Sequence, residues 1–287
     1  MTGLPAPPPL GTAMLPPGTF EDRVVLITGG GTGIGKAIAV EFARLGATVA
    51  VVSRRPEHLQ AGVEAVEAAG GRAVVARCDV REPDSVGEAF DAVEEAAGPV
   101  DALVNNAAGN FPGLAEELSP RAWRAVTQIV LDGTFFCSTE LARRSIPAGR
   151  PGAIVNIGAT YSWTGGPGTS HSAAAKAAVW NLTMSLAVEW APHAIRVNGL
   201  APGLFPHDDL PAALRGRNAP GDDPGRRIPA GRVGQLHELG WAATYLCSPF
   251  AAYLTGHTLV LDGANWLRRG LQMPEFVPVA EQLGPRS

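Results

Sequence analysis

The stretch VVLITGGGTGIGKAIAVEFARLG, residues 24–46, decides the fold of this chain. The apolar and β-branched run Val24–Thr28 predicts a buried strand, and the Ala-rich amphipathic pattern from Gly33 to Leu45 predicts a helix. A cluster of glycines joins the two. A strand, a glycine-rich turn and a helix in this order indicate the first unit of a dinucleotide-binding α/β fold.

The glycines of this turn have separate physical roles. Gly29 permits the tight turn, Gly33 lets the backbone approach a pyrophosphate, and Gly35 allows close packing of helix on strand. The free N–H groups at the start of the helix then face the phosphates. We expect dinucleotide contacts from Gly29, Thr32, Gly33, Ile34 and Gly35.

Strand-like and helix-like patterns alternate along the rest of the chain, which is typical of βαβ units. The pattern predicts strands at Val24–Thr28, Thr48–Ser53, Ala73–Cys78, Ala102–Val104, Ala153–Ile157, Ile195–Leu200 and Thr258–Leu261. It predicts helices at Gly33–Leu45, Glu57–Ala69, Pro83–Ala97, Pro120–Ile146, Ser172–Trp190 and Gln235–Leu246. The expected fold is α/β, a Rossmann-type doubly wound, seven-stranded parallel sheet with helices on both faces.

The expected organisation is a single domain over residues 21–270, flanked by two ends of different composition. Residues 1–20 are Pro-rich and predict an extended arm, either a floppy tail or an oligomer clasp, and residues 271–287 form a C-terminal tail. Residues 204–232 interrupt the pattern with Pro, Gly and mixed charge. They indicate a substrate lid or a disordered insertion, in which His207, Asp208 and Asp209 would be exposed polar groups.

Composition excludes several classes of protein. Of the 287 residues, 46% are hydrophobic and 17% are charged, so the chain can bury a large core. The net charge of −4 does not indicate binding to nucleic acids. No apolar run is long enough to span a membrane, and no signal peptide is evident. Cys78, Cys137 and Cys247 lie far apart, which argues against a disulfide framework or a metal site. We expect a cytoplasmic location.

The end of the second predicted strand bears on the choice of dinucleotide. Sites selective for NAD usually carry an acidic residue there, whereas this chain has Ser53-Arg54-Arg55. An arginine can pair with a 2′-phosphate through its planar guanidinium, so NADP(H) is favoured, with Arg54 as its contact. The alternative is that either arginine is a solvated loop charge.

Further motifs give the chain a family resemblance. The Gly29–Gly35 turn, Asp79-Val80, Asn105-Asn106-Ala107 and Pro202-Gly203 together resemble the short-chain dehydrogenase/reductase family from Asp22 to about Asp262. The resemblance implies that Asp79 and Val80 hold the adenine. It also implies that Asn106 and Ala107 border the cofactor, that Pro202 and Gly203 lie beside the nicotinamide, and that the protein is a homotetramer.

One departure narrows the resemblance. Common family members have Tyr-x-x-x-Lys, but here Ser172 stands four residues before Lys176, and the nearest tyrosine is Tyr161. This arrangement is similar to that of the NADPH-dependent 2,4-dienoyl-CoA reductases, which share NNAAGNF (residues 105–111), LSPxAW (118–123), SAxAKA (172–177) and RIPxGRxG (227–234). The resemblance implies a catalytic set of Tyr161, Asn110, Ser172 and Lys176.

These residue types suit conjugate reduction. Ser172 and Lys176 lie one helical turn apart on the same face, where Lys176 would hold the nicotinamide ribose and lower the pKa of a nearby hydroxyl. Tyr161 and Asn110 would donate hydrogen bonds to the thioester oxygen, on which negative charge develops. Ketone reduction instead needs a proton delivered to the carbonyl oxygen, which a tyrosine near the lysine normally provides, and at that site this chain has Ser172. The expected activity is therefore reduction of 2,4-dienoyl-CoA, a small-molecule acyl-CoA substrate, to 3-enoyl-CoA in unsaturated fatty acid β-oxidation.

Several alternatives remain open at this stage. The chain could be another short-chain reductase, acting on trans-2-enoyl-CoA or a 3-ketoacyl substrate, or a non-catalytic NADP(H)-binding member. Tyr161 could be a packed loop residue, Asn110 a turn residue and Ser172 a helix N-cap. His171 is expected to be a helix-entry residue rather than a base. Asp262–Asn265 reads DGAN where most of the family has a second glycine, which leaves the acyl-chain preference open.

Overall fold

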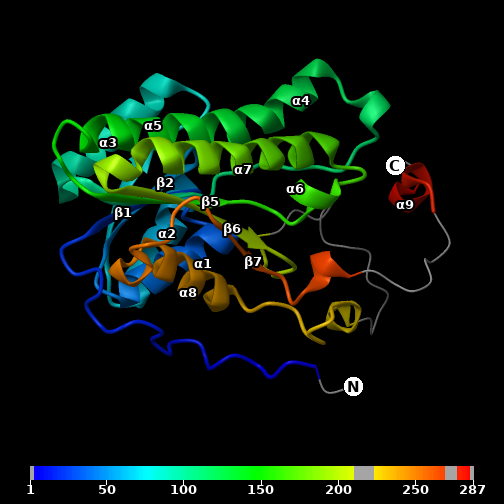
Figure 1. Cartoon of the computed structure of the whole chain (residues 1–287), viewed down its shortest axis with the longest axis horizontal. Coiled ribbons are helices and arrows are strands. Elements are labelled where there is room, and N and C mark those ends of the chain that lie inside the picture. Colours follow the sequence, from blue (N-terminus) through cyan, green and yellow to red (C-terminus); the bar gives the residue numbers. More distant parts are fainter. Residues whose placement is uncertain (1–2, 210–222, 269–276, 285–287) are drawn as a thin grey trace.

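The computed structural model describes residues 3–209, 223–268 and 277–284. Its centre is a seven-stranded, wholly parallel sheet in the order β3-β2-β1-β4-β5-β6-β7, which confirms the predicted fold (Figure 1). The strands are β1 (Val24–Thr28), β2 (Thr48–Ser53), β3 (Arg72–Arg77), β4 (Val100–Asn105), β5 (Gly152–Ile157), β6 (Ile195–Pro202) and β7 (Thr258–Leu261).

Helices cover both faces of the sheet (Figure 1). One face carries α3 (Pro83–Ala97), α5 (Gly133–Ser145) and α7 (Ser170–Trp190), and the other carries α1 (Gly33–Arg44), α2 (Pro56–Ala68) and α8 (Leu236–Cys247). Alternate residues of β1 enter separate cores, Val25 and Ile27 on one side and Val24 and Leu26 on the other. This double burial explains why the strand sequence shows no polar alternation.

The structure differs from the predicted boundaries in understandable ways. β4 is longer than the three residues expected, because Val100 also pairs with β1 and Asn105 with β5, and β6 extends to Pro202 through pairing with Leu261 of β7. The helix predicted over 120–146 is divided into α4 (Pro120–Thr127), a π-helical turn (Gln128–Asp132) and α5. Local sequence patterns do not reveal such a change of hydrogen-bond register.

Short helical segments complete the described chain. They are α6 (Tyr161–Thr164), α9 (Val279–Leu283) and 3₁₀ turns at Ala115–Glu117, Ala191–His193, Pro224–Arg227, Pro249–Ala251 and Asn265–Leu267. α6 lies at the carboxyl end of β5, and α9 lies beyond it (Figure 1). Within the described ranges, no helix is both long and apolar enough to cross a membrane.

The Pro-rich arm is packed against the domain, contrary to the floppy-tail alternative. The N–H of Leu4 donates to the carbonyl of Ala230 at 2.7 Å, and Arg232 donates to the Pro5 carbonyl at 3.0 Å. Further along, Leu15 and Phe20 are buried in the same core as α1 and α8. Burial of these two side chains makes the arm part of the fold.

Candidate active site

A cavity of about 560 Å³ opens at the carboxyl edge of the sheet, where ligands bind in folds of this kind. It brings together residues from the glycine turn, from the segments that follow β2, β3, β4 and β5, and from α7. The predicted site residues that line it are Gly29, Thr32, Gly33, Ile34, Arg54, Asp79, Val80, Asn106, Ala107, Asn110, Tyr161, Ser172 and Lys176. Three other predicted residues, Gly35, Pro202 and Gly203, do not line it.

The glycine turn has the conformation that its sequence requires. Gly29 and Gly33 have φ of +66° and +47°, a region that favours glycine. Gly35 acts through packing, because an added Cβ would lie 2.3 Å from the carbonyl oxygen of Gly29. Asn106 braces the turn, since its side-chain amide donates to the carbonyls of Thr28 and Gly29 at 3.0 and 3.2 Å. These bonds fix the turn to the segment that follows β4.

Asp209 is exposed, as expected of a lid group, but its carboxylate also contacts this turn. Its carboxylate accepts a hydrogen bond of 2.7 Å from the N–H of Gly33 and pairs with Lys36 at 3.5 Å. The hydrogen bond from Gly33 is the main reason that the pKa of Asp209 is lowered. The positive end of α1 attracts the carboxylate. His207 belongs to the same contact, because an added Cβ on Gly33 would lie 2.6 Å from its ring. The remainder of the expected lid at 210–222 lies outside the described residues.

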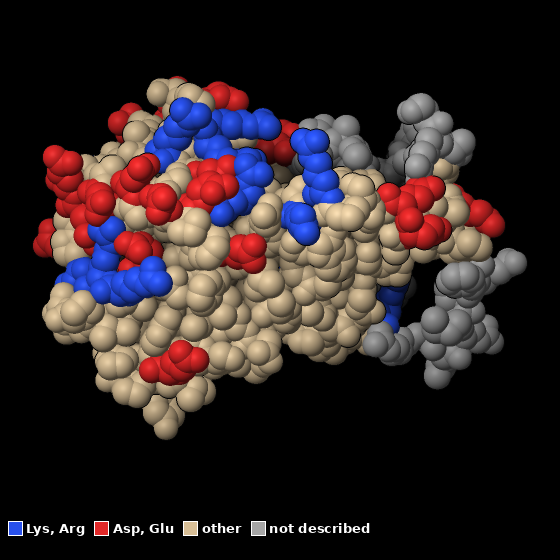
Figure 2. All heavy atoms as spheres, turned by 90° about the horizontal axis from the view of Figure 1, so that it is seen from above, with Lys and Arg blue, Asp and Glu red and all other residues tan. Residues whose placement is uncertain are grey.

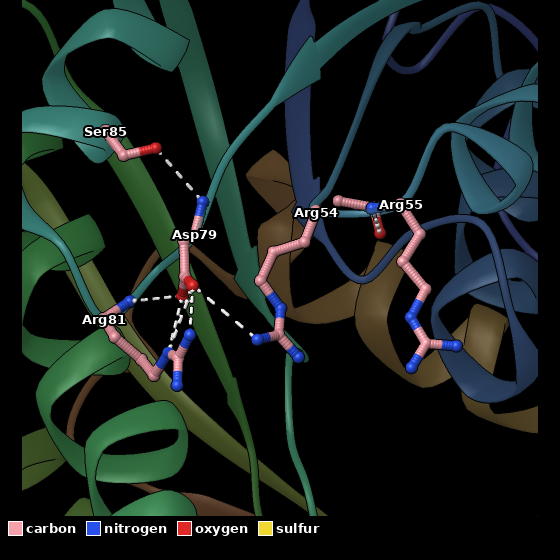
Figure 3. Close-up of polar contacts among 6 residues, drawn as sticks. Arg54, Arg55, Asp79, Arg81 and Ser85 are labelled. Atoms are coloured by element: carbon pink, nitrogen blue, oxygen red, sulfur yellow. Dashed lines mark hydrogen bonds and ion pairs between the residues drawn. The ribbon is translucent and has the colours of Figure 1, made fainter.

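A cluster of charged side chains surrounds Asp79 at the other end of the cavity (Figure 3). Arg81 donates to Asp79 through its backbone and its guanidinium, and Arg54 approaches the same carboxylate at 3.6 Å. The hydrogen bonds from Arg81 are the largest cause of the lowered pKa of Asp79. Figure 3 shows Arg54 and Arg55 extending in the same direction from the end of β2. Asp79 is therefore ionised and held, with two arginines beside it.

The tyrosine and the serine of the predicted catalytic set are in direct contact. The hydroxyls of Tyr161, on α6, and Ser172, on α7, lie 3.0 Å apart. Burial raises the pKa of the Tyr161 phenol more than this hydrogen bond lowers it. The expectation that Lys176 lowers the pKa of the nearby hydroxyl is thus wrong for Tyr161. A raised pKa keeps the phenol protonated, the form that donates a hydrogen bond.

Asn110 presents a donor to the same cavity. Its side-chain oxygen accepts a hydrogen bond of 2.9 Å from the N–H of the next residue, Phe111. This contact occupies the acceptor of the carboxamide and leaves its NH₂ group for a ligand. Asn110 and Tyr161 both line the cavity and come from the ends of different strands, β4 and β5. Two donors from separate strand ends can meet at one oxygen atom of a bound molecule.

Lys176 lies deep in the site. Its amine donates to the carbonyl of Ile157 at the end of β5. Burial lowers the pKa of Lys176 to about 8. The side chain is only 6% exposed, so nearly all of its hydration is lost. The cation would gain most from hydroxyl or phosphate oxygens of a ligand in the cavity.

An aromatic stack holds α6 in place, and the sequence analysis missed it. The ring of Trp163 lies between the rings of Trp180 and Trp266, with both centroid distances 5.3 Å. Trp266 is fixed by its N–H, which donates to Asp262 at 2.7 Å. The DGAN segment thus contributes through Trp266 to the support of the helix that carries Tyr161. No local periodicity links these three tryptophans, so only the fold reveals them.

The remaining candidates, His171, Pro202 and Gly203, lie outside the cavity lining. His171 lies in the first turn of α7, as expected. The centroid of its ring lies 4.5 Å from that of the Phe111 ring, and burial lowers the pKa of His171. β6 ends at Pro202, and an added Cβ on Gly203, the next residue, would lie 2.4 Å from the Cβ of Asp262. That these two residues lie beside the nicotinamide stays a prediction. The three cysteines are free and buried. Within the described part of the chain, no His, Cys, Asp or Glu side chains form a group that could hold a metal ion.

Comparison with known proteins identifies the family of this chain. A family model described as Enoyl-(Acyl carrier protein) reductase matches residues 29–264. The chain belongs to the short-chain dehydrogenase/reductase family. It is 40% identical over 259 residues to a probable 2,4-dienoyl-CoA reductase [(2E)-enoyl-CoA-producing] of Bacillus subtilis, covering 86% of this chain and 98% of that protein. It is also 40% identical over 252 residues to the peroxisomal 2,4-dienoyl-CoA reductase [(3E)-enoyl-CoA-producing] of Mus musculus, covering 88% and 86%.

A solved structure shows the same architecture. Gluconate 5-dehydrogenase from Burkholderia cenocepacia, in complex with NADP and tartrate, superposes with a TM-score of 0.79 and 35% identity, covering 87% of this chain and 97% of that one. The family uses nicotinamide cofactors, and the chain is an oxidoreductase. The turn at Gly29 and Gly33, whose positive φ angles open it to the cavity, fits the pyrophosphate of such a dinucleotide.

Proposed function

We propose that this chain uses NADPH to reduce 2,4-dienoyl-CoA thioesters to 3-enoyl-CoA in the breakdown of unsaturated fatty acids. The observation that carries the proposal is the contact between Tyr161 and Ser172. It puts a phenol in the cavity although the residue four before Lys176 is a serine. The two relatives named as 2,4-dienoyl-CoA reductases support the same substrate class.

The chemistry follows from the donors in the cavity. A nicotinamide dinucleotide held in the cavity would supply the hydride for the far end of the conjugated diene. The displaced electron pair moves to the thioester oxygen, where Tyr161 and Asn110 donate hydrogen bonds to the developing negative charge. A phenol of raised pKa suits this role, because it stabilises the oxyanion without giving up its proton. A proton taken from solvent water at the carbon next to the thioester then gives the 3-enoyl product and leaves hydroxide. Lys176 orients the ribose through its buried amine.

Charge at the end of β2 favours NADP(H). Arg54 and Arg55 line the cavity, and Arg54 is already held near an anion, the Asp79 carboxylate at 3.6 Å. A 2′-phosphate offers the guanidinium a stronger partner than a carboxylate that Arg81 already neutralises. The relative solved with bound NADP is consistent with this choice.

An open hollow beside the cavity suits the phosphates of coenzyme A. Arg81, Arg121 and Arg124 line this hollow of about 650 Å³ together with Ser119 and Gln128, and it contains no acidic side chain. Three guanidinium groups around one concave surface attract a polyanion.

We also propose that the protein is a homotetramer. α5 and α7 expose Phe135, Met184 and Val188, the last with 78% of its surface accessible. Figure 2 shows this face: charged side chains gather toward the α3 end, and a broad neighbouring area carries almost none. Light scattering of the purified protein tests the assembly, and a monomer would refute it. The cytoplasmic location stays a prediction that microscopy of the labelled protein can test.

The deciding experiment is a substrate comparison. NADPH oxidation is followed with a trans-2,trans-4-dienoyl-CoA, a trans-2-enoyl-CoA and a 3-ketoacyl-CoA in parallel. Rapid turnover of the dienoyl substrate alone supports the proposal, and NMR of the product distinguishes the 3-enoyl from the 2-enoyl isomer. Turnover of only the enoyl or ketoacyl substrate would identify another short-chain reductase. Binding of NADPH without turnover of any of the three would identify a non-catalytic member.

A further inference from the structure

The contact between Asp209 and Gly33 places a negative charge of the protein itself at the start of α1. The first N–H groups of a helix have no partner within the helix and attract anions. In this chain the N–H of Gly33 already donates to the Asp209 carboxylate, and Lys36 on the same helix adds an ion pair. The Gly33 N–H and the Lys36 amine would both bind a phosphate, and both already contact the Asp209 carboxylate.

The same space is needed by the dinucleotide. Gly33, Asp209 and His207 all line the cavity that also contains Arg54 and Lys176. The absence of a side chain at Gly33 leaves room that the His207 ring fills, 2.6 Å from where a Cβ would be. A pyrophosphate approaching the N–H of Gly33 would meet both the ring and the carboxylate. Two anions cannot share this single donor without strong repulsion.

We propose that Asp209 is an affinity-determining residue of the dinucleotide site, whose carboxylate competes with the cofactor's pyrophosphate for Gly33 and Lys36 and is displaced when the cofactor binds. The inference rests on the proposed dinucleotide site and identifies Asp209 as a group of the protein that competes with the cofactor there. Binding then includes the cost of breaking the contact between Asp209 and Gly33, so the observed affinity is weaker than the site itself would give.

The local structure permits this displacement without disturbing the fold. Phe205 is buried, and an added Cβ on Gly234 would lie 2.2 Å from its ring, while the N–H of Gly234 donates to Leu204 at 3.0 Å. The segment is therefore anchored at Leu204 and Phe205. Asp209 lies four residues beyond this anchor, with its side chain 36% exposed. We expect rotation of the backbone between Pro206 and Asp209 to free the Gly33 N–H while this anchor stays in place.

The test measures binding, which does not depend on turnover. Asp209→Asn removes the charge at nearly constant size, and Asp208→Asn makes the same change in net charge one residue earlier. Dissociation constants for NADPH, inorganic pyrophosphate and adenosine 2′-monophosphate are measured by calorimetry for both variants and the wild type. The last ligand carries the 2′-phosphate but no pyrophosphate, so it reports on Arg54 and not on Gly33.

We expect Asp209→Asn to bind NADPH and pyrophosphate about tenfold more tightly than the wild type, which is the effect of one partly screened charge-assisted hydrogen bond. Adenosine 2′-monophosphate should bind equally to both, and Asp208→Asn should change NADPH affinity much less. Unchanged or weaker NADPH binding in Asp209→Asn overturns the inference, as does an equal gain in Asp208→Asn. Failure of every variant, wild type included, to bind NADPH would instead refute the dinucleotide site.

Discussion

The hydroxyl oxygens of Tyr161 and Ser172 lie 3.0 Å apart, although eleven positions in the sequence and a glycine-rich loop separate them. Both side chains line the cavity, but Ser172 is buried in the first turns of α7, whereas Tyr161 on α6 is only partly buried. In the proposed mechanism, Ser172 orients the phenol and Tyr161 contacts the substrate. Substitution should separate these two roles.

Tyr161→Phe removes the donor to the thioester oxygen and should lower kcat for the dienoyl substrate by about 10²–10³, the usual effect of losing one oxyanion donor. Ser172→Ala removes only the orienting hydrogen bond and should cost about tenfold. Both variants should bind NADPH as the wild type does. Steady-state kinetics and NADPH titration provide the measurements, with the exposed Tyr253→Phe as control. Equal losses in Tyr161→Phe and Tyr253→Phe would contradict the assigned role.

Arg54→Gln should weaken NADP(H) binding by about tenfold and leave NAD(H) binding unchanged, because only the former carries a 2′-phosphate. We expect a loss of only this size because the Arg54 side chain is 47% exposed, so that solvent partly screens its charge. Arg72→Gln is the matched control, since Arg72 begins β3 at the opposite edge of the sheet and donates to Ala96. Parallel loss of NAD(H) affinity in Arg54→Gln would contradict a 2′-phosphate contact.

Lys176 makes the free energy of unfolding depend on pH. Its pKa is about 8 in the folded protein and 10.5 as the ordinary value, so between these pH values the unfolded chain binds a proton that the folded chain lacks. Stability contributed by this group therefore rises with pH across that window and is constant below and above it. The difference in stability between wild type and Lys176→Met should grow by up to about 3 kcal/mol from pH 8 to pH 10.5. Urea unfolding at several pH values measures it, and a constant difference would show that the amine keeps its ordinary pKa.

Ala264 offers a stabilising substitution. It has φ of +66°, a left-handed conformation that costs a residue with a Cβ about 1 kcal/mol. Ala264→Gly should raise the free energy of unfolding by about 0.5–1 kcal/mol, because the relief of strain exceeds the added entropy of the unfolded chain. Ala191→Gly, where φ is −54°, should have the opposite sign. Thermal unfolding of both variants measures the change in stability. A less stable Ala264→Gly variant would show that the backbone at Ala264 is not strained.

The packed arm predicts a contrast between two leucines. Leu15 is 8% exposed and Leu10 is 66% exposed. Leu15→Ala should destabilise the protein by about 2 kcal/mol, near the lower limit for a buried leucine, whereas Leu10→Ala should have almost no effect. Calorimetric melting temperatures of the two variants test this, and similar values would mean that the arm does not contribute to the core.

The sequence alone predicted the elements in which the local hydrophobic pattern agrees with the global fold. β1, β2 and β7 have the predicted bounds because apolar runs end at turn residues, and Gly29 and Gly33 have the conformations that a phosphate-binding turn needs. What it could not reveal depends on contacts between distant segments. Asp209 meets Gly33 across 176 positions, and the stack of Trp163 on Trp180 and Trp266 joins three separate elements. Arg81 is an intermediate case, since its place two residues after Asp79 was a visible signal.

The contact between Leu4 and Ala230 bears on how the protein is prepared for study. Polypeptide fused ahead of residue 3 would emerge beside the segment that follows β6, and α9, near the other end of the described chain, packs against Gly168 in the loop before α7. Leu4 and α9 thus lie toward the same side of the molecule as α6, the helix that carries Tyr161 (Figure 1). We expect an affinity tag joined to either end of the chain to extend from that side. Rates and dissociation constants are therefore best measured after the tag has been cleaved.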